Sequence, residues 1–384
     1  MRSAGRLELA AALAAVRVKT LRMVETLDDA QWRVPRLATI NPPLWEIGHV
    51  AWFQERWCLR ARDGVLANGS LLAGSDRVFD SAAVAHETRW DLDLPRLAAT
   101  EAYLRDVLDA SLAALAIAPE TDDGLYFFRL ALFHEMMHVE ALTYTWQTLS
   151  YRAPLHPTPI VAPGGGSPDL VVPGGKAEFG ARPGDGFCFD NEKWNHPAEL
   201  APYRIAARPV SNGQFLAFVA AGGYREPRWW NPEAYAALQA AGRELPRYWR
   251  MVGDKVYARR FEHWLQIDPD APVIHVDAHE AEAWCRWAGR RLPDEREWEM
   301  AARTQADFEW GDRVWEWTSS AFEPYPGFSP DPYEQYSAPW FGDHRAVRGG
   351  SFATPRGMVD ERFRNFYLPD RGDIFVGFRS CTDA

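Results

Sequence analysis

Two histidines stand four residues apart in the tract HEMMH, which covers His134 to His138. In an α-helix, residues four apart differ by only about 40° around the axis, so both imidazoles would face the same side. Imidazole nitrogens bind divalent metals, and this spacing lets one helix chelate a single ion. A histidine pair in polar packing is the alternative. The spacing, on a helix expected inside a bundle, favours a metal site.

The same five residues also match HExxH, the signature of zinc proteases, in which Glu135 would be the general base. A zinc hydrolase is therefore a rival function, and a third ligand helps to decide between the two. Glu140 lies two residues beyond His138, which turns it toward the opposite side of the helix. It is a poor third ligand.

His49 is a better candidate for the third ligand. It lies within WEIGHVAWF, Trp45 to Phe53, where a polar ring among apolar side chains would be costly unless hydrogen-bonded or ligated. A hydrogen-bonded core histidine is the alternative, and His86, on a predicted loop, is a weaker candidate. Three imidazoles leave coordination positions open, but they suit zinc, copper, iron and nickel alike.

Four amphipathic helices are predicted to carry these residues. They are expected at about 6–28, 44–62, 95–116 and 122–149. Pro95 suits a first helical position, and acidic residues at 122–123 suit the first turn of the last helix. Four such helices joined by loops indicate a bundle, with a long connection at about 63–94 that could line a site.

Residues 153–175 are rich in Pro and Gly, which predicts a linker between a helical domain, 1–152, and a second domain, 176–384. In the second domain short β-like runs alternate with Gly, Pro, Asn and Asp. Only two good helices are expected there, near 211–221 and 279–289. This pattern indicates an irregular α+β domain with long loops.

The composition excludes several classes of protein. The chain has 384 residues, enough for two domains, with 47% hydrophobic and 25% charged residues, as in ordinary globular proteins. A net charge of −11 disfavours nucleic-acid binding, and no apolar run is long enough to span a membrane. The four cysteines form no CxxC pair, which fits a reducing cytoplasm. The 18 tryptophans suit either ordinary cores or a cation–π pocket for a quaternary ammonium ligand.

Two sets of tracts resemble known families. Trp45 to Phe53 and His134 to Glu140 together resemble the DinB-like helical domain of the sulfoxide synthases of ergothioneine biosynthesis. Four later tracts resemble the formylglycine-generating-enzyme fold, which is C-type-lectin-like: RLPDEREWE at 291–299, VWEW at 314–317, RGGSF at 348–352 and GFR at 377–379. The resemblance covers nearly the whole chain and implies that His49, His134 and His138 bind Fe(II). Formylglycine generation itself is not expected, because neither Cys285 nor Cys381 sits in a matching motif.

Within that family the closest likeness is to the selenoneine synthases. It is carried by tracts at 41–46, 80–90 and 126–134. The chain departs from the sulfoxide-synthase pattern at Met137, where those enzymes have Gln. It departs again at Tyr367, where members that use γ-glutamylcysteine have an Asp that helps to hold the amino-acid part of the thiol. The resemblance therefore implies a selenosugar donor, with an ergothioneine-type enzyme that uses cysteine or γ-glutamylcysteine as the alternative.

The implied reaction is O2-dependent formation of a carbon–selenium bond between a selenosugar and hercynine, a histidine-derived betaine. Tyr333 and Tyr336 are candidate proton donors, with ordinary loop aromatics as the alternative. Candidate substrate contacts by family position are Trp90, Asn365, Phe366 and Arg371. A lectin-like binding module without catalysis is a further alternative, which the metal triad disfavours.

Overall fold

The computed structural model describes residues 1–62, 65–67, 69–153 and 168–384, which fall into two compact units. The first unit contains the described residues up to Ala153 together with Pro183–Cys188 and Thr354–Met358. The second contains residues 168–182, Phe189–Ala353 and Val359–Ala384. Two short segments that follow the start of the second unit in the sequence therefore belong to the first unit.

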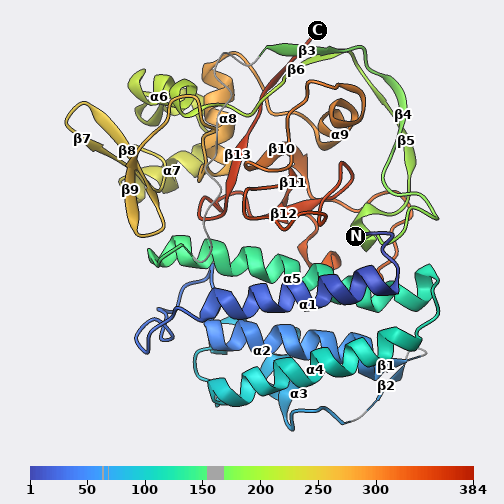
Figure 1. Ribbon diagram of the computed structural model, residues 1–384. Coiled ribbons are helices and arrows are strands. Elements are labelled where there is room, and N and C mark those ends of the chain that lie inside the picture. Colours follow the sequence, from blue (N-terminus) through green and yellow to red (C-terminus); the bar gives the residue numbers. More distant parts are fainter. Residues whose placement is uncertain (63–64, 68, 154–167) are drawn as a thin grey trace. The chain divides into compact units, whose positions relative to one another are not determined.

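Long helices dominate the described part of the first unit (Figure 1). They are α1 (Arg6–Val24), α2 (Pro43–Gln54), α4 (Leu97–Ile117) and α5 (Asp122–Leu149). Helix α1 packs against α5, and α2 packs against α4. The start of α5 is fixed by Thr121, whose side chain accepts a hydrogen bond from the backbone N–H of Gly124. None of the described helices is both long and apolar enough to cross a lipid bilayer.

The predicted helix at 44–62 is not α-helical to its end. After Gln54 the chain continues as a π-helical segment, η1 (Glu55–Arg60), and then pairs β1 (Ala61–Arg62) with β2 (Val65–Leu66). The long connection that follows contains α3 (Ser75–Phe79) and the 3-10 turn η2 (His86–Thr88). π-Helical segments are often found beside functional sites.

Four small sheets make up the described strands of the second unit. The largest has the order β12 (Asn365–Tyr367), β11 (Arg345–Gly349), β10 (Trp315–Ala321), β13 (Val376–Phe378), in which β10 and β13 run parallel. A second has the order β14 (Cys381–Asp383), β6 (Tyr203–Ala206), β3 (Asp169–Val172). The others are the hairpin of β4 (Gly175–Phe179) and β5 (His196–Leu200), and the meander of β7 (Trp249–Val252), β8 (Lys255–Arg260) and β9 (His263–Gln266). Strand β3 lies in the stretch predicted as a linker, of which residues 154–167 lie outside the described residues.

The expectation of only two helices in the second unit was wrong. Helices α6 (Asn212–Ala220) and α8 (Ala278–Trp287) were predicted, but α7 (Pro232–Ala240) and α9 (Glu295–Thr304) also form. Helix α9 begins with a capping box, in which Asp294 accepts from the N–H of Arg296 and Glu297 accepts from the N–H of Asp294. Asn231 caps α7 in a similar way, ahead of Pro232 at the first helical position.

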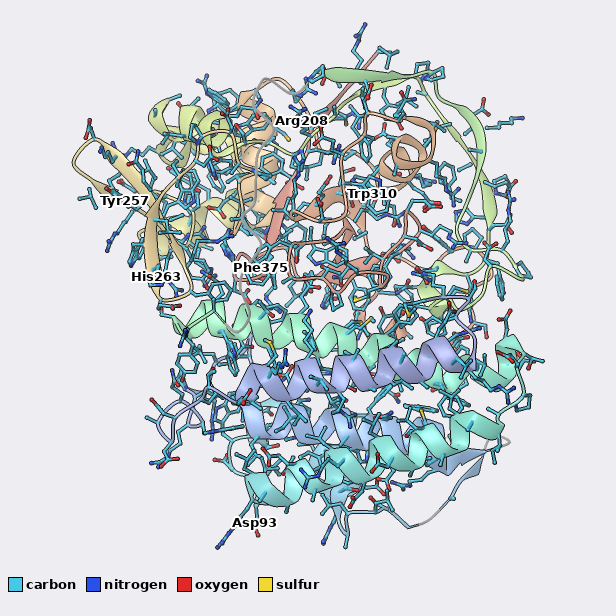
Figure 2. The ribbon with its side chains drawn as sticks, viewed as in Figure 1. Asp93, Arg208, Tyr257, His263, Trp310 and Phe375 are labelled. Atoms are coloured by element: carbon cyan, nitrogen blue, oxygen red, sulfur yellow. The ribbon has the colours of Figure 1, made fainter. Side chains whose placement is uncertain are left out.

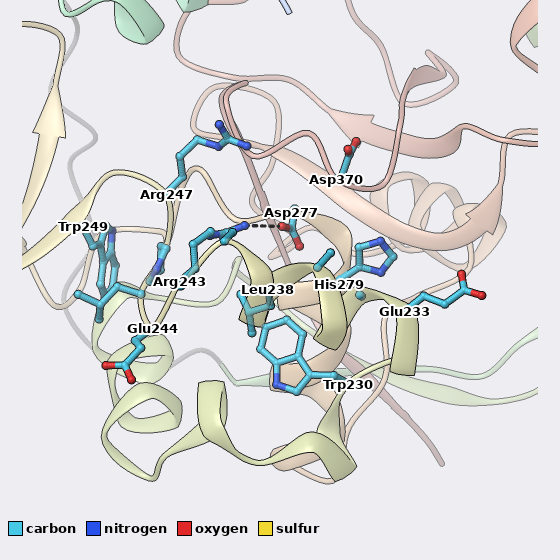
Figure 3. A pocket seen from close by; sticks show the side chains of 16 residues that line it. Trp230, Glu233, Leu238, Arg243, Glu244, Arg247, Trp249, Asp277, His279 and Asp370 are labelled. Atoms are coloured by element: carbon cyan, nitrogen blue, oxygen red, sulfur yellow. Dashed lines mark hydrogen bonds and ion pairs between the residues drawn. The ribbon is translucent and has the colours of Figure 1, made fainter. Parts of the chain in front are cut away.

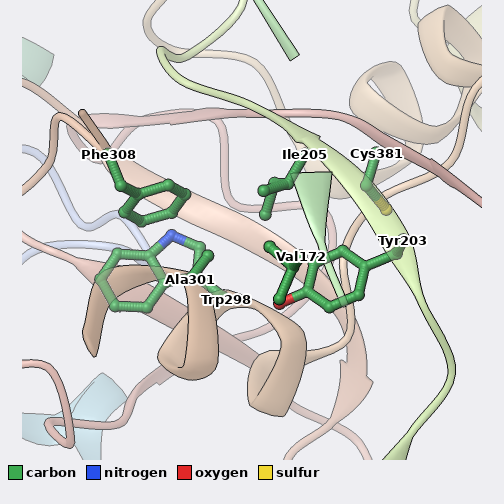
Figure 4. Packing of buried hydrophobic residues seen from close by; sticks show 7 residues of the cluster. All are labelled: Val172, Tyr203, Ile205, Trp298, Ala301, Phe308 and Cys381. Carbon is green, nitrogen blue, oxygen red and sulfur yellow. The ribbon is translucent and has the colours of Figure 1, made fainter. Parts of the chain in front are cut away.

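A hydrophobic cluster joins α9 to the β14–β6–β3 sheet (Figure 4). Its buried members are Val172, Tyr203, Ile205, Trp298, Ala301, Phe308 and Cys381. Trp310, labelled in Figure 2, packs on the ring of Trp298 with centroids 5.1 Å apart. The indole N–H of Trp298 donates to Glu316, which also pairs with the fully buried Arg379. The tracts VWEW and GFR thus meet in one buried polar contact.

Candidate metal centre

Three imidazoles from two helices meet inside the first unit. His49 lies on α2, and His134 and His138 lie one turn apart on α5. The three ligand nitrogens all lie within 4.8 Å of one another, and the Nε2 atoms of His134 and His138 are 3.2 Å apart. His49 and His134 are buried, whereas His138 is half-buried. This arrangement fits one metal ion held by three imidazoles, with other coordination positions left for further ligands.

Hydrogen bonds at Nδ1 direct two of these rings toward the common centre. Nδ1 of His49 is 2.7 Å from the carbonyl oxygen of Phe79, which can only accept, so the ring must donate there. Nδ1 of His138 is 2.8 Å from Oε1 of Glu46, a side chain that is 1% exposed. In both rings Nε2 is then the unprotonated nitrogen that can bind a metal.

Aromatic packing and burial surround two rings of the cluster, those of His49 and His134. Trp45 stacks on His49 with centroids 4.8 Å apart, and Phe53 stacks on His134 with centroids 3.5 Å apart. Burial, reinforced by the neighbouring His138, lowers the pKa of His49 and of His134 well below the ordinary value. Neutral imidazoles are the form that binds metal, so these rings need lose no proton at neutral pH.

Glu135, the second residue of HExxH, is turned away from the three histidines. Its carboxylate forms two hydrogen bonds with the Arg17 guanidinium, at 2.9 and 3.0 Å, and accepts a third from Thr20 at 2.7 Å. The side chains of Glu135 and Arg17 are each 2% exposed. A carboxylate held in a buried ion pair is not available as a general base at the metal, which weighs against the zinc-peptidase alternative.

The remaining candidates in the first unit stand apart from the three-histidine group. Glu140 accepts a hydrogen bond from Thr354 at 2.8 Å. His86 lies in η2, with Nε2 2.8 Å from the carbonyl oxygen of Ile40, and its ring meets that of Trp90 edge to face. Trp90 itself donates its indole N–H to the carbonyl of Val34 at 3.0 Å. Trp90 and His86 therefore have structural partners of their own.

In the second unit, the candidate tyrosines and Phe366 form one aromatic group. Tyr333 immediately precedes the 3-10 turn η6 (Glu334–Tyr336), and Tyr336 is the last residue of that turn. Their ring centroids are 6.1 Å apart. Tyr336 meets Phe366 of β12 edge to face at 5.9 Å. Asn365, also on β12, donates to the hydroxyl of Tyr367 at 3.4 Å, and Arg371 lies over the Tyr367 ring at 5.5 Å. The structure thus groups the five predicted residues of the second unit around β12.

A buried polar support holds the tyrosine turn, and its residues were not among those predicted. Phe189 stacks on Tyr336 with centroids 4.2 Å apart. Ser337, which is fully buried, donates to Asp190 at 2.5 Å and accepts from Asn191 at 3.0 Å. Burial raises the pKa of Asp190 to about 6. These contacts fix the backbone next to Tyr336.

Glu46 is a residue in contact with the three-histidine group that the sequence interpretation missed. It lies three residues before His49, so both side chains project from the same face of α2. A carboxylate at that spacing from a proposed ligand was a readable signal for a residue that orients the metal site.

The cysteines offer no reactive thiol pair. None of the four forms a disulfide bond, and Cys285 and Cys381 of the second unit are buried. Burial raises the pKa of Cys381 to about 12, and it also raises the pKa of Cys285. Both are therefore protonated thiols at neutral pH, and thiol is a far weaker nucleophile and metal ligand than thiolate.

Two protein families match the sequence, one for each part of the chain. Residues 12–142 match the DinB superfamily. Residues 165–314 and 313–384 match the sulfatase-modifying factor enzyme 1-like domain. The predicted combination of a helical DinB-like domain with a formylglycine-generating-enzyme-like α+β domain is confirmed.

Similar proteins extend over both parts together. The hercynine oxygenase of Mycolicibacterium smegmatis is 35% identical over an alignment 432 residues long, which covers 98% of this chain and 99% of that protein. The hercynine oxygenase of Mycobacterium tuberculosis is 33% identical over 430 residues, again covering 98% and 99%. Ergothioneine biosynthesis protein 1 of Schizosaccharomyces pombe is 26% identical over 227 residues, which cover 50% of this chain and 27% of that protein.

Proposed function

Because the chain belongs to the hercynine oxygenase family, we propose that it is a non-haem Fe(II) enzyme that uses O2 to join a chalcogen atom to hercynine. The observation that carries this proposal is the cluster of His49, His134 and His138, whose ligand nitrogens lie within 4.8 Å of one another. Two of the rings are held with Nε2 toward the centre, and no carboxylate belongs to the cluster among the described residues.

The donor set fits Fe(II). Three neutral imidazoles bind a divalent ion without cancelling its charge, and they leave positions for O2 and for a chalcogenolate. Bound iron would reduce O2 and hold the reactants together, which removes the entropic cost of a three-body encounter. Glu46 and the Phe79 carbonyl would orient two ligands, and the aromatic rings of Trp45 and Phe53 would exclude water from them.

The overall reaction balances without a further reductant. One C–H bond of the hercynine imidazole and one chalcogen–hydrogen bond break, and one carbon–chalcogen bond forms. One oxygen atom of O2 ends on the chalcogen, and the other leaves as water with the two hydrogens. The four electrons that O2 accepts come from the two substrates. We propose the phenols of Tyr333 and Tyr336 as sources of the proton that reduced oxygen takes up, with Trp90, Asn365, Phe366 and Arg371 as substrate contacts.

For the donor we propose a selenosugar, so that the product lies on a route to selenoneine. An α-amino acid carries an ammonium group, whose natural partner is an ionised carboxylate. Tyr367 stands where family members that use γ-glutamylcysteine have Asp, and a neutral phenol supplies no full charge. A sugar offers hydroxyl groups, which phenol and amide side chains bind well. A selenol is also more fully ionised at neutral pH than a thiol, so it reaches a metal without a nearby base.

An ergothioneine-type sulfoxide synthase is the second candidate. It would use the same metal site but take cysteine or γ-glutamylcysteine as the donor. The observation in its favour is the similarity to proteins named for hercynine oxygenation and ergothioneine biosynthesis.

Competition between donors separates the two candidates. The Fe(II)-loaded protein is given hercynine, O2 and equal amounts of a selenosugar and γ-glutamylcysteine, and the products are identified by mass spectrometry. We expect the hercynine–selenosugar adduct to dominate. A product dominated by the γ-glutamylcysteine sulfoxide would favour the second candidate, an ergothioneine-type sulfoxide synthase, and would leave the proposed iron chemistry unchanged.

A further inference from the structure

Arg371 and Asp373 form a two-point ion pair in the turn between β12 and β13. Nε of Arg371 is 2.6 Å from Oδ1 of Asp373, and Nη2 is 2.8 Å from Oδ2. The Asp373 side chain is 2% exposed and that of Arg371 is 19% exposed. A pair with this parallel geometry is among the stronger ionic contacts in proteins. Breaking the pair would leave one charge buried without its partner, which is costly. We therefore expect the pair to persist, with the two charges cancelling each other.

Two uncharged side chains, Tyr367 and Asn365, continue from Arg371. The Arg371 guanidinium lies over the ring of Tyr367, at 5.5 Å from its centroid. The hydroxyl of Tyr367 accepts a hydrogen bond from the Asn365 amide at 3.4 Å. Asn365, Tyr367, Arg371 and Asp373 thus form a chain of contacting side chains that is rich in hydrogen-bond donors and acceptors and whose formal charges cancel. We call these four residues the neutral wall.

We propose that Asp373 is a specificity-determining residue: by pairing with Arg371 it cancels the cation that would otherwise draw in a donor bearing a carboxylate. The neutral wall then favours an uncharged, hydroxyl-rich donor over an amino acid. This inference rests on the proposed function, under which Asn365 and Arg371 contact the substrate. It adds the residue that sets the choice of donor class.

The chain contains a matched control in the same turn. Asp370 is exposed and lines a hollow of about 930 Å³ on the second unit, together with Arg243, Arg247 and His279 (Figure 3). Asp370→Asn removes one negative charge three residues from Asp373 and leaves the Arg371–Asp373 pair in place. Asp373→Asn removes the same charge together with the two-point ion pair that cancels the Arg371 cation. A comparison of the two separates pairing from a general change of charge.

The first experiment compares donors that share selenium but differ in charge. Wild type, Asp373→Asn and Asp370→Asn, each loaded with Fe(II), receive hercynine, O2 and equal amounts of 1-selenoglucose and selenocysteine. The ratio of the two adducts is independent of the fraction of protein that is folded. We expect the ratio of amino-acid to sugar adduct to rise about tenfold or more in Asp373→Asn, the effect of one hydrogen bond to a charged group. Asp370→Asn should match wild type.

A second measurement tests the inference without turnover. In the absence of O2, calorimetry measures the binding of 3-mercaptopropionate, a thiol with a carboxylate and no ammonium, to the three Fe(II)-loaded proteins. Asp373→Asn should bind it about tenfold more tightly than the other two. Equal ratios and equal affinities in Asp373→Asn and Asp370→Asn would overturn the role of Asp373. Failure of wild type to form either adduct would instead overturn the proposed function, and the binding comparison would still decide the inference.

Discussion

Glu46 on α2 accepts a hydrogen bond from Nδ1 of His138 on α5, at 2.8 Å, and its side chain is 1% exposed. A buried carboxylate behind a ligating histidine fixes the tautomer of the ring, holds its orientation and makes it a stronger donor to the metal. The contact also joins the two helices that supply the three imidazoles. It therefore links the folding of the bundle to the assembly of the metal site.

Replacing Glu46 with Gln should weaken iron binding and leave the fold intact. Gln keeps the shape and can still accept from the ring, but it removes the negative charge behind His138. We expect the affinity for Fe(II) to fall by about 10- to 100-fold, as for other residues that orient metal ligands. Competition with a metal-binding dye measures this. Glu25→Gln, at an exposed position just after α1, is the control. Equal affinities for the two variants would show that Glu46 has no role at the metal.

Replacing His49, His134 or His138 with Ala should abolish turnover and greatly reduce bound iron. Each change removes one of three nitrogens that face a common centre, and two imidazoles rarely hold a divalent ion against dilution. Iron analysis after desalting gives the occupancy, with His263→Ala, an exposed residue of the second unit, as the control. Full occupancy in His49→Ala would mean that another residue supplies the third nitrogen, with His86 next in line.

Replacing Glu135 with Gln should cost stability and spare the metal. The change breaks a buried ion pair with Arg17, which typically destabilises a protein by about 3–5 kcal/mol when one charge is left alone. We expect a lower unfolding midpoint in urea, with unchanged iron content and unchanged turnover per bound iron. If the variant keeps its metal but loses a zinc-dependent peptidase activity present in wild type, the oxidative function is wrong.

Asp190 should make stability depend on pH in a defined direction. Burial raises its pKa in the folded protein from 3.8 to about 6, so between these values the native state holds a proton that the unfolded chain has lost. Stability from this group is therefore present at low pH and declines as the pH rises through that window. Asp190→Asn cannot ionise and lacks this decline. We expect the variant to gain stability relative to wild type from about pH 4 to about pH 6, and then to keep a constant difference.

Urea unfolding at several pH values measures this difference. Asp307→Asn, at an exposed position after α9, is the control and should show no such trend. A difference between Asp190→Asn and wild type that stays flat across the window would show that Asp190 has an ordinary pKa. Ser337 would then donate its hydrogen bond to a carboxyl group of ordinary pKa.

Local rules were sufficient to predict the long helices of the first unit and the histidine pair on α5. The i, i+4 spacing of His134 and His138 is a property of one helix. The apolar residues around His49 made it the better candidate for the third ligand, and the family resemblance then selected it. Glu46 was missed because its partner, His138, is on another helix. Helix α9 was missed even though Asp294 and Glu297 stand at the spacing of a capping box. The many charged residues of this helix leave only a short apolar pattern for its buried face.

Contacts between residues far apart in sequence could not be predicted. Nothing local indicates that Ser337 meets Asp190 and Asn191, or that Thr354 meets Glu140. The pairing of Arg371 with Asp373 could not be predicted either, although the two residues belong to one turn. Side chains in a turn can be arranged in many ways, and only the path of the backbone decides whether these two meet. Tertiary packing supplies this information, and a single sequence does not contain it in readable form.

The most direct test of the proposed chemistry is metal-dependent consumption of hercynine. The protein is loaded with Fe(II) or with Zn(II) in the absence of O2, mixed with hercynine and a chalcogen donor, and then exposed to O2. Mass spectrometry follows the carbon–chalcogen adduct. We predict that the adduct forms only with Fe(II) and only after O2 is added, and that it disappears in His134→Ala. Absence of any adduct with Fe(II) and O2, or equal product with Zn(II), would contradict an iron-dependent oxidative function.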